Sequence, residues 1–165
     1  MRPLFDLDLH DYDPALPELY RVAVRGIVFA DGKLLVVRTA DGLFKLPGGG
    51  QEPGETDRDT LLREVEEETG YRVDPLSVRP FGQVEEKRLS AEKDRLFHQV
   101  NHYYLCRVTG EQGACRYTQS EQSLGFRPLW VTLEEAAAAR PLDGWPRREQ
   151  RLFAYLQQAG PKILT

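Results

Sequence analysis

The alternation of apolar and polar positions predicts that strands dominate the first part of the chain. Residues 21–30 and 33–39 are apolar, β-branched runs separated by Asp31-Gly32, a dipeptide typical of a tight hairpin turn. Residues 4–9 alternate apolar and acidic positions, as a short edge strand does. A further short strand is predicted at residues 42–47.

A loop rich in glycine and proline is predicted at residues 47–56, followed by a helix at residues 57–69. Thr56 is a natural N-cap, because its hydroxyl can accept a backbone N–H, and Asp59 completes a capping-box-like pair. Gly70 is a natural stop, since glycine readily adopts the left-handed conformation that ends helices.

The remaining sequence predicts strands first and helices last. The long strands are rich in aromatic and β-branched residues, and Thr132 and Pro146 are well placed to start the two helices. This order favours the α/β (α+β) class, with a mixed sheet flanked by helices. The predicted strands are 71–89, 96–108 and 124–132, and the predicted helices are 132–140 and 146–160.

Length and charge limit the function classes. The chain has 165 residues, which suits a single domain over residues 1–165, and its net charge of −4 argues against a general nucleic-acid binder. No apolar run reaches the ~20 residues of a membrane span, and the N-terminus is too acidic for a signal peptide. Cys106 and Cys115 lack metal-ligand spacing and predict reduced thiols, so a cytoplasmic protein is expected.

Three glutamates of the predicted helix, Glu64, Glu67 and Glu68, share one side of it at i, i+3, i+4 spacing. They lie near the C-terminus of the helix, where partial negative charge disfavours acids. A solvated face, with Arg63 paired to Asp59 and Glu67, is the usual explanation for such a run. A hard-cation site is the alternative, because Mg²⁺ prefers oxygen ligands and bridges phosphates.

The spacing around these glutamates decides between the two, because residues 49–71 resemble the Nudix box. That box is Gly, five residues, Glu, seven residues, Arg-Glu-apolar-any-Glu-Glu-any-Gly-apolar. Tyr71 departs from it at the final apolar position, where tyrosine can still pack an apolar ring. The matching positions are Gly49, Glu55, Arg63, Glu64, Val65, Glu67, Glu68 and Gly70.

The resemblance implies a Nudix-type α/β/α sandwich and a Nudix hydrolase. Such enzymes use Mg²⁺ or Mn²⁺ to hydrolyse a nucleoside diphosphate linked to another moiety. By the same resemblance, Arg63 orients the glutamates through a salt bridge and Glu55 helps to fix the loop on the helix. The implied metal ligands are the backbone carbonyl of Gly48 and the carboxylates of Glu64, Glu67 and Glu68.

Two further roles remain open. The general base is either a box glutamate or one from a later loop or strand, and Glu85 and Glu86 are candidates for base or extra metal ligand. Alternation sends these two to opposite faces of a strand, so at most one faces the site. His98 and His102 share a strand face but lie ~13 Å apart, too far for one metal, and are interpreted as packing or solvent-facing residues.

Substrate contacts are assigned from strand positions. Arg38 ends the second strand of the hairpin, where Nudix proteins often bind nucleotide or phosphate, and Arg25 and Lys45 lie on neighbouring strands. Stacking on a base is considered for three aromatic residues, although a core position is preferred for each. They are Phe44, Tyr103 and Tyr104.

The substrate itself stays open. A nucleoside triphosphate, with oxidised and non-standard ones included, is the default, and ADP-ribose or a nucleotide sugar is the alternative. A non-catalytic nucleotide sensor and an isoprenyl diphosphate isomerase are rival functions. The intact box disfavours the sensor, and the lack of a well-placed cysteine disfavours the isomerase. A small-molecule partner without nucleic acid or membrane is expected, and a homodimer is left open.

Overall fold

The computed structural model describes residues 1–140 and 148–160. In this part of the chain, a curled mixed sheet has the strand order β1-β7-β8-β2-β3-β10, with β4 paired to β3 and β5 to β2. β6 and β9 form a separate small sheet. The strands are β1 (Pro3–Asp8), β2 (Glu18–Ala30), β3 (Lys33–Arg38), β4 (Phe44–Lys45), β5 (Gly48–Gly50), β6 (Arg72–Val73), β7 (Arg79–Leu89), β8 (Leu96–Cys106), β9 (Val108–Thr109) and β10 (Arg127–Val131).

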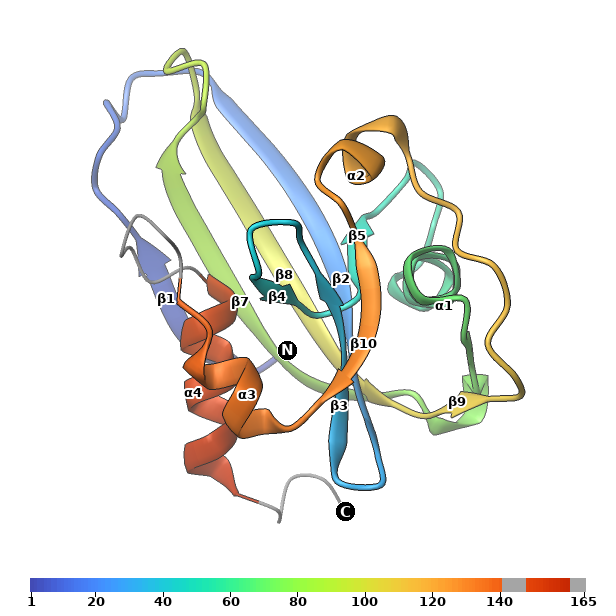
Figure 1. Cartoon of the computed structure of the whole chain (residues 1–165). Coiled ribbons are helices and arrows are strands. Elements are labelled where there is room, and N and C mark those ends of the chain that lie inside the picture. Colours follow the sequence, from blue (N-terminus) through green and yellow to red (C-terminus); the bar gives the residue numbers. More distant parts are fainter. Residues whose placement is uncertain (141–147, 161–165) are drawn as a thin grey trace.

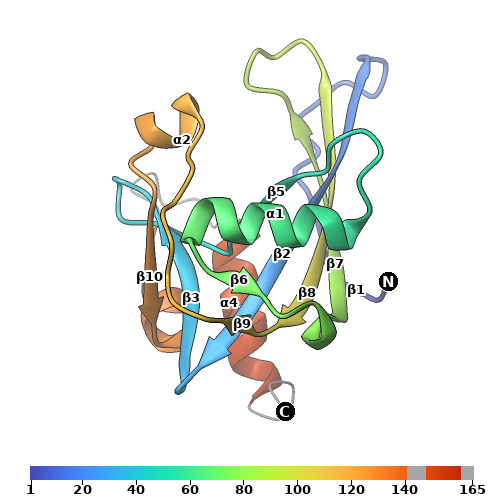
Figure 2. The same ribbon diagram turned by 90° about the vertical axis from the view of Figure 1, so that its right-hand side faces the viewer.

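Helices cover both faces of this sheet, which confirms the predicted α/β/α arrangement. The helix α1 lies on one face and α3 and α4 lie on the other (Figures 1 and 2). No helix in the described residues is long and apolar enough to cross a membrane. The helices are α1 (Asp57–Thr69), α2 (Gln119–Ser123), α3 (Leu133–Ala138) and α4 (Arg148–Ala159), with a 3-10 turn at Pro75–Ser77.

Two apolar clusters hold the layers together. On one face, Leu61 and Val65 of α1 are fully buried against Val24 and Val28 of β2. Burial of such a side chain contributes ~1.5–3 kcal/mol. The close approach of α1 requires a glycine in β2, because a Cβ on Gly26 would lie 3.1 Å from the Val65 side chain. The opposite cluster includes Ile27, Leu34, Val36, Leu152, Phe153 and Leu156.

Local signals in the sequence placed the first elements correctly. The Asp31-Gly32 turn joins β2 and β3, and both of its residues have positive φ. The helix α1 spans the predicted residues 57–69, with the Thr56 capping box and the left-handed Gly70 in place. β1 is an edge strand as predicted, paired parallel to β7.

Three predicted boundaries are wrong. The strand expected at 71–89 breaks into β6, a 3-10 turn and β7, because Asp74 caps a turn that Pro75 starts. The strand expected at 96–108 divides into β8 and β9. Gly48–Gly50, expected to be loop, forms β5 and pairs with β2. The predicted helix start at Pro146 lies outside the described residues.

Candidate metal and substrate cleft

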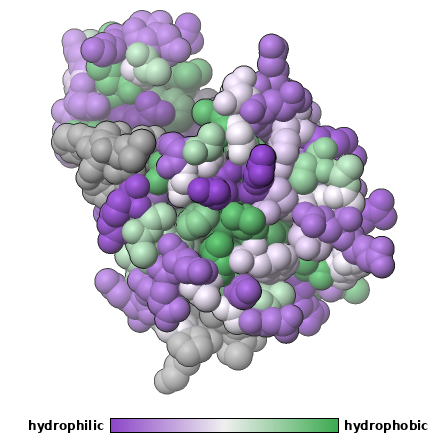
Figure 3. Space-filling view, viewed as in Figure 1, coloured by the Kyte–Doolittle hydropathy of each residue, from purple (hydrophilic) through white to green (hydrophobic). Residues whose placement is uncertain are grey.

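A cleft of about 1110 Å³ opens where β5 and α1 meet the curled sheet. Its size is slightly above the ~300–1,000 Å³ typical of small-molecule sites. Its walls come from β1, β2, β4, β5, β7, β8, α1, α2 and the first turn of α4. These elements surround the centre of the view in Figure 1, and in Figure 3 strongly hydrophilic residues lie beside a hydrophobic patch there.

The glycines of β5 let the chain pass between the sheet and the helix. A Cβ on Gly48 would lie 2.1 Å from the carbonyl oxygen of Val24, and its φ of 142° is one that side chains disfavour. A Cβ on Gly49 would lie 2.5 Å from the carboxyl group of Glu64. Glycine at both positions therefore brings the backbone of β5 directly against the acidic face of α1.

Three of the predicted ligands, Gly48, Glu64 and Glu68, line the cleft. Glu68 is 3% exposed, and its Oε2 accepts a hydrogen bond of 2.8 Å from the backbone N–H of Gly48. Burial raises the pKa of Glu68 to about 7, although Lys45 acts in the opposite direction. Burial also raises the pKa of Glu64, against the effect of Arg63. Both carboxyls therefore lack full compensation for burial, which a divalent cation would supply.

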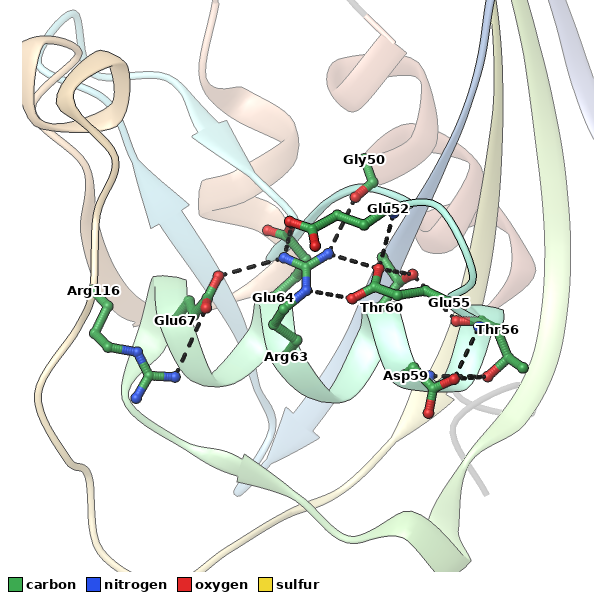
Figure 4. A network of polar contacts seen from close by, with 10 residues as sticks. All are labelled: Gly50, Glu52, Glu55, Thr56, Asp59, Thr60, Arg63, Glu64, Glu67 and Arg116. Carbon is green, nitrogen blue, oxygen red and sulfur yellow. Dashed lines mark hydrogen bonds and ion pairs between the residues drawn. The ribbon is translucent and has the colours of Figure 1, made fainter.

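Arg63 organises the acidic face, as predicted from the resemblance (Figure 4). Its Nε and Nη2 donate to the two carboxylate oxygens of Glu55 at 2.6 and 2.8 Å, and this pairing lowers the pKa of Glu55 to about 2. Its Nη1 donates to Glu64 at 2.6 Å, and its Nη2 also reaches the carbonyl oxygen of Gly50 at 3.3 Å. One guanidinium thus joins the loop, the helix and a cleft carboxylate.

Glu67 does not point into the cleft. Its carboxylate lies 3.4 Å from Arg63 and 3.8 Å from Arg116, and it is not among the cleft-lining residues (Figure 4). Accordingly, no group of three acidic, histidine or cysteine side chains in residues 1–140 and 148–160 is close enough to hold a metal. The donors nevertheless fit a hard cation, because Glu64 and Glu68 offer oxygens beside Gly49 and rotation of Glu67 would add a third.

The structure also shows how α1 tolerates acids at its C-terminal end. The last turn has no basic residue, but the segment after β9 supplies donors to the final carbonyls. The backbone N–H groups of Gly113 and Arg116 donate to the carbonyls of residues 70 and 67, both at 2.7 Å. The side chains of Gln112 and Tyr117 donate to those of residues 69 and 68, at 2.9 and 3.0 Å. Satisfied carbonyls weaken the negative end of the helix dipole.

The three cations predicted to bind substrate have different positions. Arg25 and Lys45 line the cleft, whereas Arg38 is exposed at the end of β3 and is not a lining residue. Arg25 is buried and donates from Nη1 to the carbonyls of Leu46 and Gly48, at 3.2 and 3.0 Å. Arg25 therefore braces β5 and occupies one side of the carbonyl that the resemblance implies is a metal ligand.

Glu85 and Glu86 point to opposite faces of β7, as alternation predicts. Glu86 lines the cleft, but its two oxygens accept hydrogen bonds from Arg88 at 3.0 Å and Arg148 at 2.7 Å. Glu85 contacts Lys87 at 3.1 Å and Nε2 of His98 at 2.7 Å. Both carboxylates are thus engaged in ion pairs, and this arrangement gives no support to a role as base or metal ligand.

Two histidines and Tyr104 of β8 contact carboxylates of neighbouring elements. His98 contacts Glu18 as well as Glu85, so the prediction of simple packing or solvent exposure missed its carboxylate partners. Asp57, at the start of α1, is 2.7 Å from both His102 and the hydroxyl of Tyr104. Tyr103 is 1% exposed in the core, and burial raises its pKa to about 12. Of the aromatic residues considered for stacking, Phe44 lines the cleft.

Several cleft residues were missed by sequence reasoning. Glu121 reaches the wall from α2, and its charge contributes to the raised pKa of Glu64. The Thr118–Glu121 capping box was the available signal for this helix. Arg148 and Glu149 form a buried pair in the first turn of α4. No local sequence pattern indicates that this turn lines a cleft whose other residues are far away in the sequence.

Replacing Arg63 by lysine is expected to lower kcat/KM at least about tenfold. A single ammonium cannot donate to Glu55 and Glu64 in the forked geometry of the guanidinium. Arg58→Lys is the matched control, because Arg58 lies on the same helix and donates to the carbonyl of Pro75 at 3.0 Å. Steady-state kinetics on both variants test this role. Wild-type kcat/KM in Arg63→Lys would contradict it.

Comparisons with known proteins agree with this arrangement. A family model described as NUDIX domain matches residues 19–154. The chain is 31% identical over 150 residues to "Nucleoside diphosphate-linked moiety X motif 6" of Mus musculus, which covers 87% of this chain and 45% of that protein. It is 33% identical over 91 residues to "Nucleoside triphosphatase NudI" of Enterobacter sp. (strain 638), which covers 52% of this chain and 64% of that protein.

A solved structure shares the fold. The NUDIX hydrolase from Nitrosomonas europaea superposes with a TM-score of 0.63 over 86% of this chain and 90% of that chain, at 20% identity. This likeness concerns the arrangement of the sheet and helices. The chain spans less than two thirds of the length of the two relatives above, with 45% and 64% of them covered.

Proposed function

Because this chain belongs to the Nudix family, we propose that it hydrolyses the phosphoanhydride of a nucleoside diphosphate linked to another moiety, with Mg²⁺ or Mn²⁺ as cofactor. The observation that carries the proposal is a pair of carboxyls beside the glycine strand β5 at the wall of a large cleft. Glu64 is partly buried and pairs with Arg63, and Glu68 is buried and accepts a hydrogen bond from the Gly48 N–H. Such a pair costs stability in an apolar setting and suits a metal-assisted hydrolase.

Separate residues of the cleft would hold the cation and contact the phosphates of the substrate. Glu64 and Glu68, joined by Glu67 after its side chain turns from Arg116, would hold the cation. When bound, the cation would neutralise anionic phosphate oxygens and lower the pKa of bound water. Lys45 lies in the same cleft and would add positive charge beside the phosphates. Positioning and electrostatics of this kind account for most of the catalysis in phosphoryl transfer.

The choice of substrate is a finer proposal. We propose a nucleoside triphosphate as the default substrate, with ADP-ribose or a nucleotide sugar as the alternative. The test is hydrolysis of a panel containing nucleoside triphosphates, nucleotide sugars and dinucleotides, with Mg²⁺ and with identification of the products. Cleavage between phosphorus atoms, giving a nucleoside monophosphate, is the expected result. Tight nucleotide binding without turnover of any panel member would instead favour a non-catalytic sensor.

Addition of Mg²⁺ is expected to raise the melting temperature in the absence of substrate. A cation that binds only the folded state and is present at a concentration of about 100 times its Kd raises the free energy of unfolding by ~2.7 kcal/mol. The physical cause is compensation of the negative charges of Glu64 and Glu68, so the melting curves recorded with increasing Mg²⁺ should move progressively above the metal-free curve. An unchanged melting temperature at millimolar Mg²⁺ and Mn²⁺ would argue against a preformed site.

A further inference from the structure

A compact patch of the cleft wall consists of four side chains on β7 and β8. Arg88 pairs in register with Phe97, and Glu86 pairs in register with Gln99. All four line the cleft. Residues two apart on a strand share a face and lie ~7 Å apart, so these cross-strand pairs form a single surface on a rigid antiparallel ladder. We call this surface, Glu86–Arg88–Phe97–Gln99, the shelf.

The guanidinium of Arg88 is fixed on the shelf by three contacts. Its Cζ lies over the ring of Phe97, 4.1 Å from the centroid. Its Nε donates to Glu86 at 3.0 Å, and its Nη1 donates to the carbonyl oxygen of Leu89 at 3.1 Å. A third of the side chain remains exposed. A planar, immobilised group is therefore presented to the cleft, and a flat ligand can stack on it at little entropic cost.

Gln99 supplies a hydrogen-bond acceptor beside this surface. The Nε of Arg25 can only donate, so the atom of Asn101 that it contacts at 3.4 Å is the acceptor Oδ1. The same Oδ1 lies 2.8 Å from Gln99, which must therefore present its Nε2 to it. This leaves Oε1 of Gln99, which accepts no hydrogen bond from the described residues. An N–H group at the edge of a ligand would satisfy it.

Charge distinguishes the shelf from the part of the cleft wall that Glu64 and Glu68 form. Arg88 and Arg148 are matched by Glu86 and Glu149 in a chain of ion pairs, with N–O distances of 3.0 Å and 2.7 Å on the two sides of Glu86. The shelf is thus charge-balanced, and a phosphate gains little from it. Elsewhere in the cleft, the carboxylates of Glu64 and Glu68 lie against Arg63 and the Gly48 N–H and suit a cation bound to phosphates. An uncharged planar group fits the shelf.

We propose that the shelf is the nucleobase seat, in which the base stacks on Arg88 and donates an edge N–H to Gln99. The proposal rests on the proposed function in one respect, namely that the substrate carries a nucleoside. Arg88 and Gln99 then act through recognition of the base, whereas Glu64 and Glu68 act at the phosphates. Phe97 and Glu86 position Arg88.

Calorimetric titration tests the seat with simple probes, namely AMP, GMP, CMP, UMP and ribose 5-phosphate in millimolar Mg²⁺. In the wild-type protein at least one nucleotide should bind about tenfold or more tightly than ribose 5-phosphate, since base stacking is sequence-tolerant and strong. Arg88→Met should abolish this difference and leave the affinity for ribose 5-phosphate within about twofold. Arg79→Met is the matched control, because Arg79 is exposed on the same strand and does not line the cleft.

Arg88→Lys separates stacking from charge. Lysine keeps the positive charge but lacks the planar group, so it should lose nearly as much nucleotide affinity as methionine does. Wild-type affinity in Arg88→Lys would overturn the seat and indicate a charge contact. An equal loss for nucleotide and ribose 5-phosphate in Arg88→Met would overturn it as well, since that pattern belongs to a phosphate contact.

Gln99→Met provides an independent variant. It removes the acceptor while keeping the shape of the side chain, and it should weaken the best-binding nucleotide about tenfold without affecting ribose 5-phosphate. Unchanged nucleotide affinity would contradict the role of Gln99. Because these titrations measure binding, they test the seat even if no panel member is hydrolysed. Equal affinity of the wild-type protein for ribose 5-phosphate and for every nucleotide tested, together with hydrolysis of a panel member, would refute the seat and leave the proposed function intact.

Discussion

Replacing Glu68 by glutamine is expected to lower kcat by about 100-fold or more while the fold is retained. The side chain is 3% exposed, lines the cleft and accepts a hydrogen bond from the backbone of Gly48. Glutamine has the same shape and keeps that acceptor, but it has no charge to offer a cation. The loss should therefore appear in kcat at saturating substrate and in the concentration of Mg²⁺ needed for half-maximal rate.

The stability of the same variant should change in the opposite direction. Burial raises the pKa of Glu68 from 4.5 to about 7, so between these pH values the folded state keeps a proton that the unfolded chain has released. With metal removed by a chelator, the free energy of unfolding of the wild-type protein therefore falls as pH rises through this window. Above the window, the loss of stability caused by the buried charge is complete. Glu68→Gln removes the penalty and should raise the free energy of unfolding by ~1–3 kcal/mol at pH 8, with no change at pH 4.

Glu66→Gln is the matched control for both measurements. Glu66 lies on the same helix but pairs with Arg72 at 3.3 Å and does not line the cleft. Its kcat and its stability at either pH should stay close to those of the wild-type protein. If Glu68→Gln retained wild-type kcat, Glu68 would have no part in holding the cofactor.

Replacing Gly48 by alanine is expected to destabilise the fold by about 3 kcal/mol or more and to abolish activity. The added Cβ would lie 2.1 Å from the carbonyl oxygen of Val24 and 2.7 Å from the Cα of Arg25. Both are backbone atoms that cannot move aside without breaking the pairing of β5 with β2. The φ of 142° adds a conformational penalty.

Gly54→Ala separates steric overlap from backbone conformation. Gly54 has a φ of 85°, but nothing lies within 4 Å of an added Cβ. Gly54→Ala should therefore lower the free energy of unfolding by only ~1 kcal/mol, because alanine is disfavoured in the left-handed backbone conformation, and activity should persist. Urea unfolding of both variants tests the comparison. Equal, small losses of stability in the two variants would show that β5 does not require the close approach described here.

Local chemistry explains why much of the site was predictable. The capping residues Thr56 and Gly70 act on their own neighbours, so the bounds of α1 follow from the sequence alone. The helical spacing of Glu64 and Glu68 likewise determines which face they share. The resemblance implied a salt bridge from Arg63 to the box glutamates, and Arg63 lies 2.6 Å from Glu64 and 3.4 Å from Glu67, whereas its pairing with Glu55 was not predicted.

Long-range contacts explain what was missed. Gly48–Gly50 becomes a strand because β2 supplies a partner that no local pattern indicates. The carboxylate of Glu67 turns away from the cleft because Arg116, from a segment after β9, lies beside it. The shelf depends on the register between β7 and β8, which side-chain alternation in either strand does not specify.

The most direct test of the account is a crystal structure of the protein soaked in Mn²⁺, with anomalous scattering used to locate the ion. The account predicts an ion beside β5, held by Glu64 and Glu68, with Glu67 turned from Arg116 toward it. An anomalous map with no peak there, and with the carboxylates of α1 unchanged at saturating Mn²⁺, would contradict the claim that they hold the metal of a pyrophosphohydrolase.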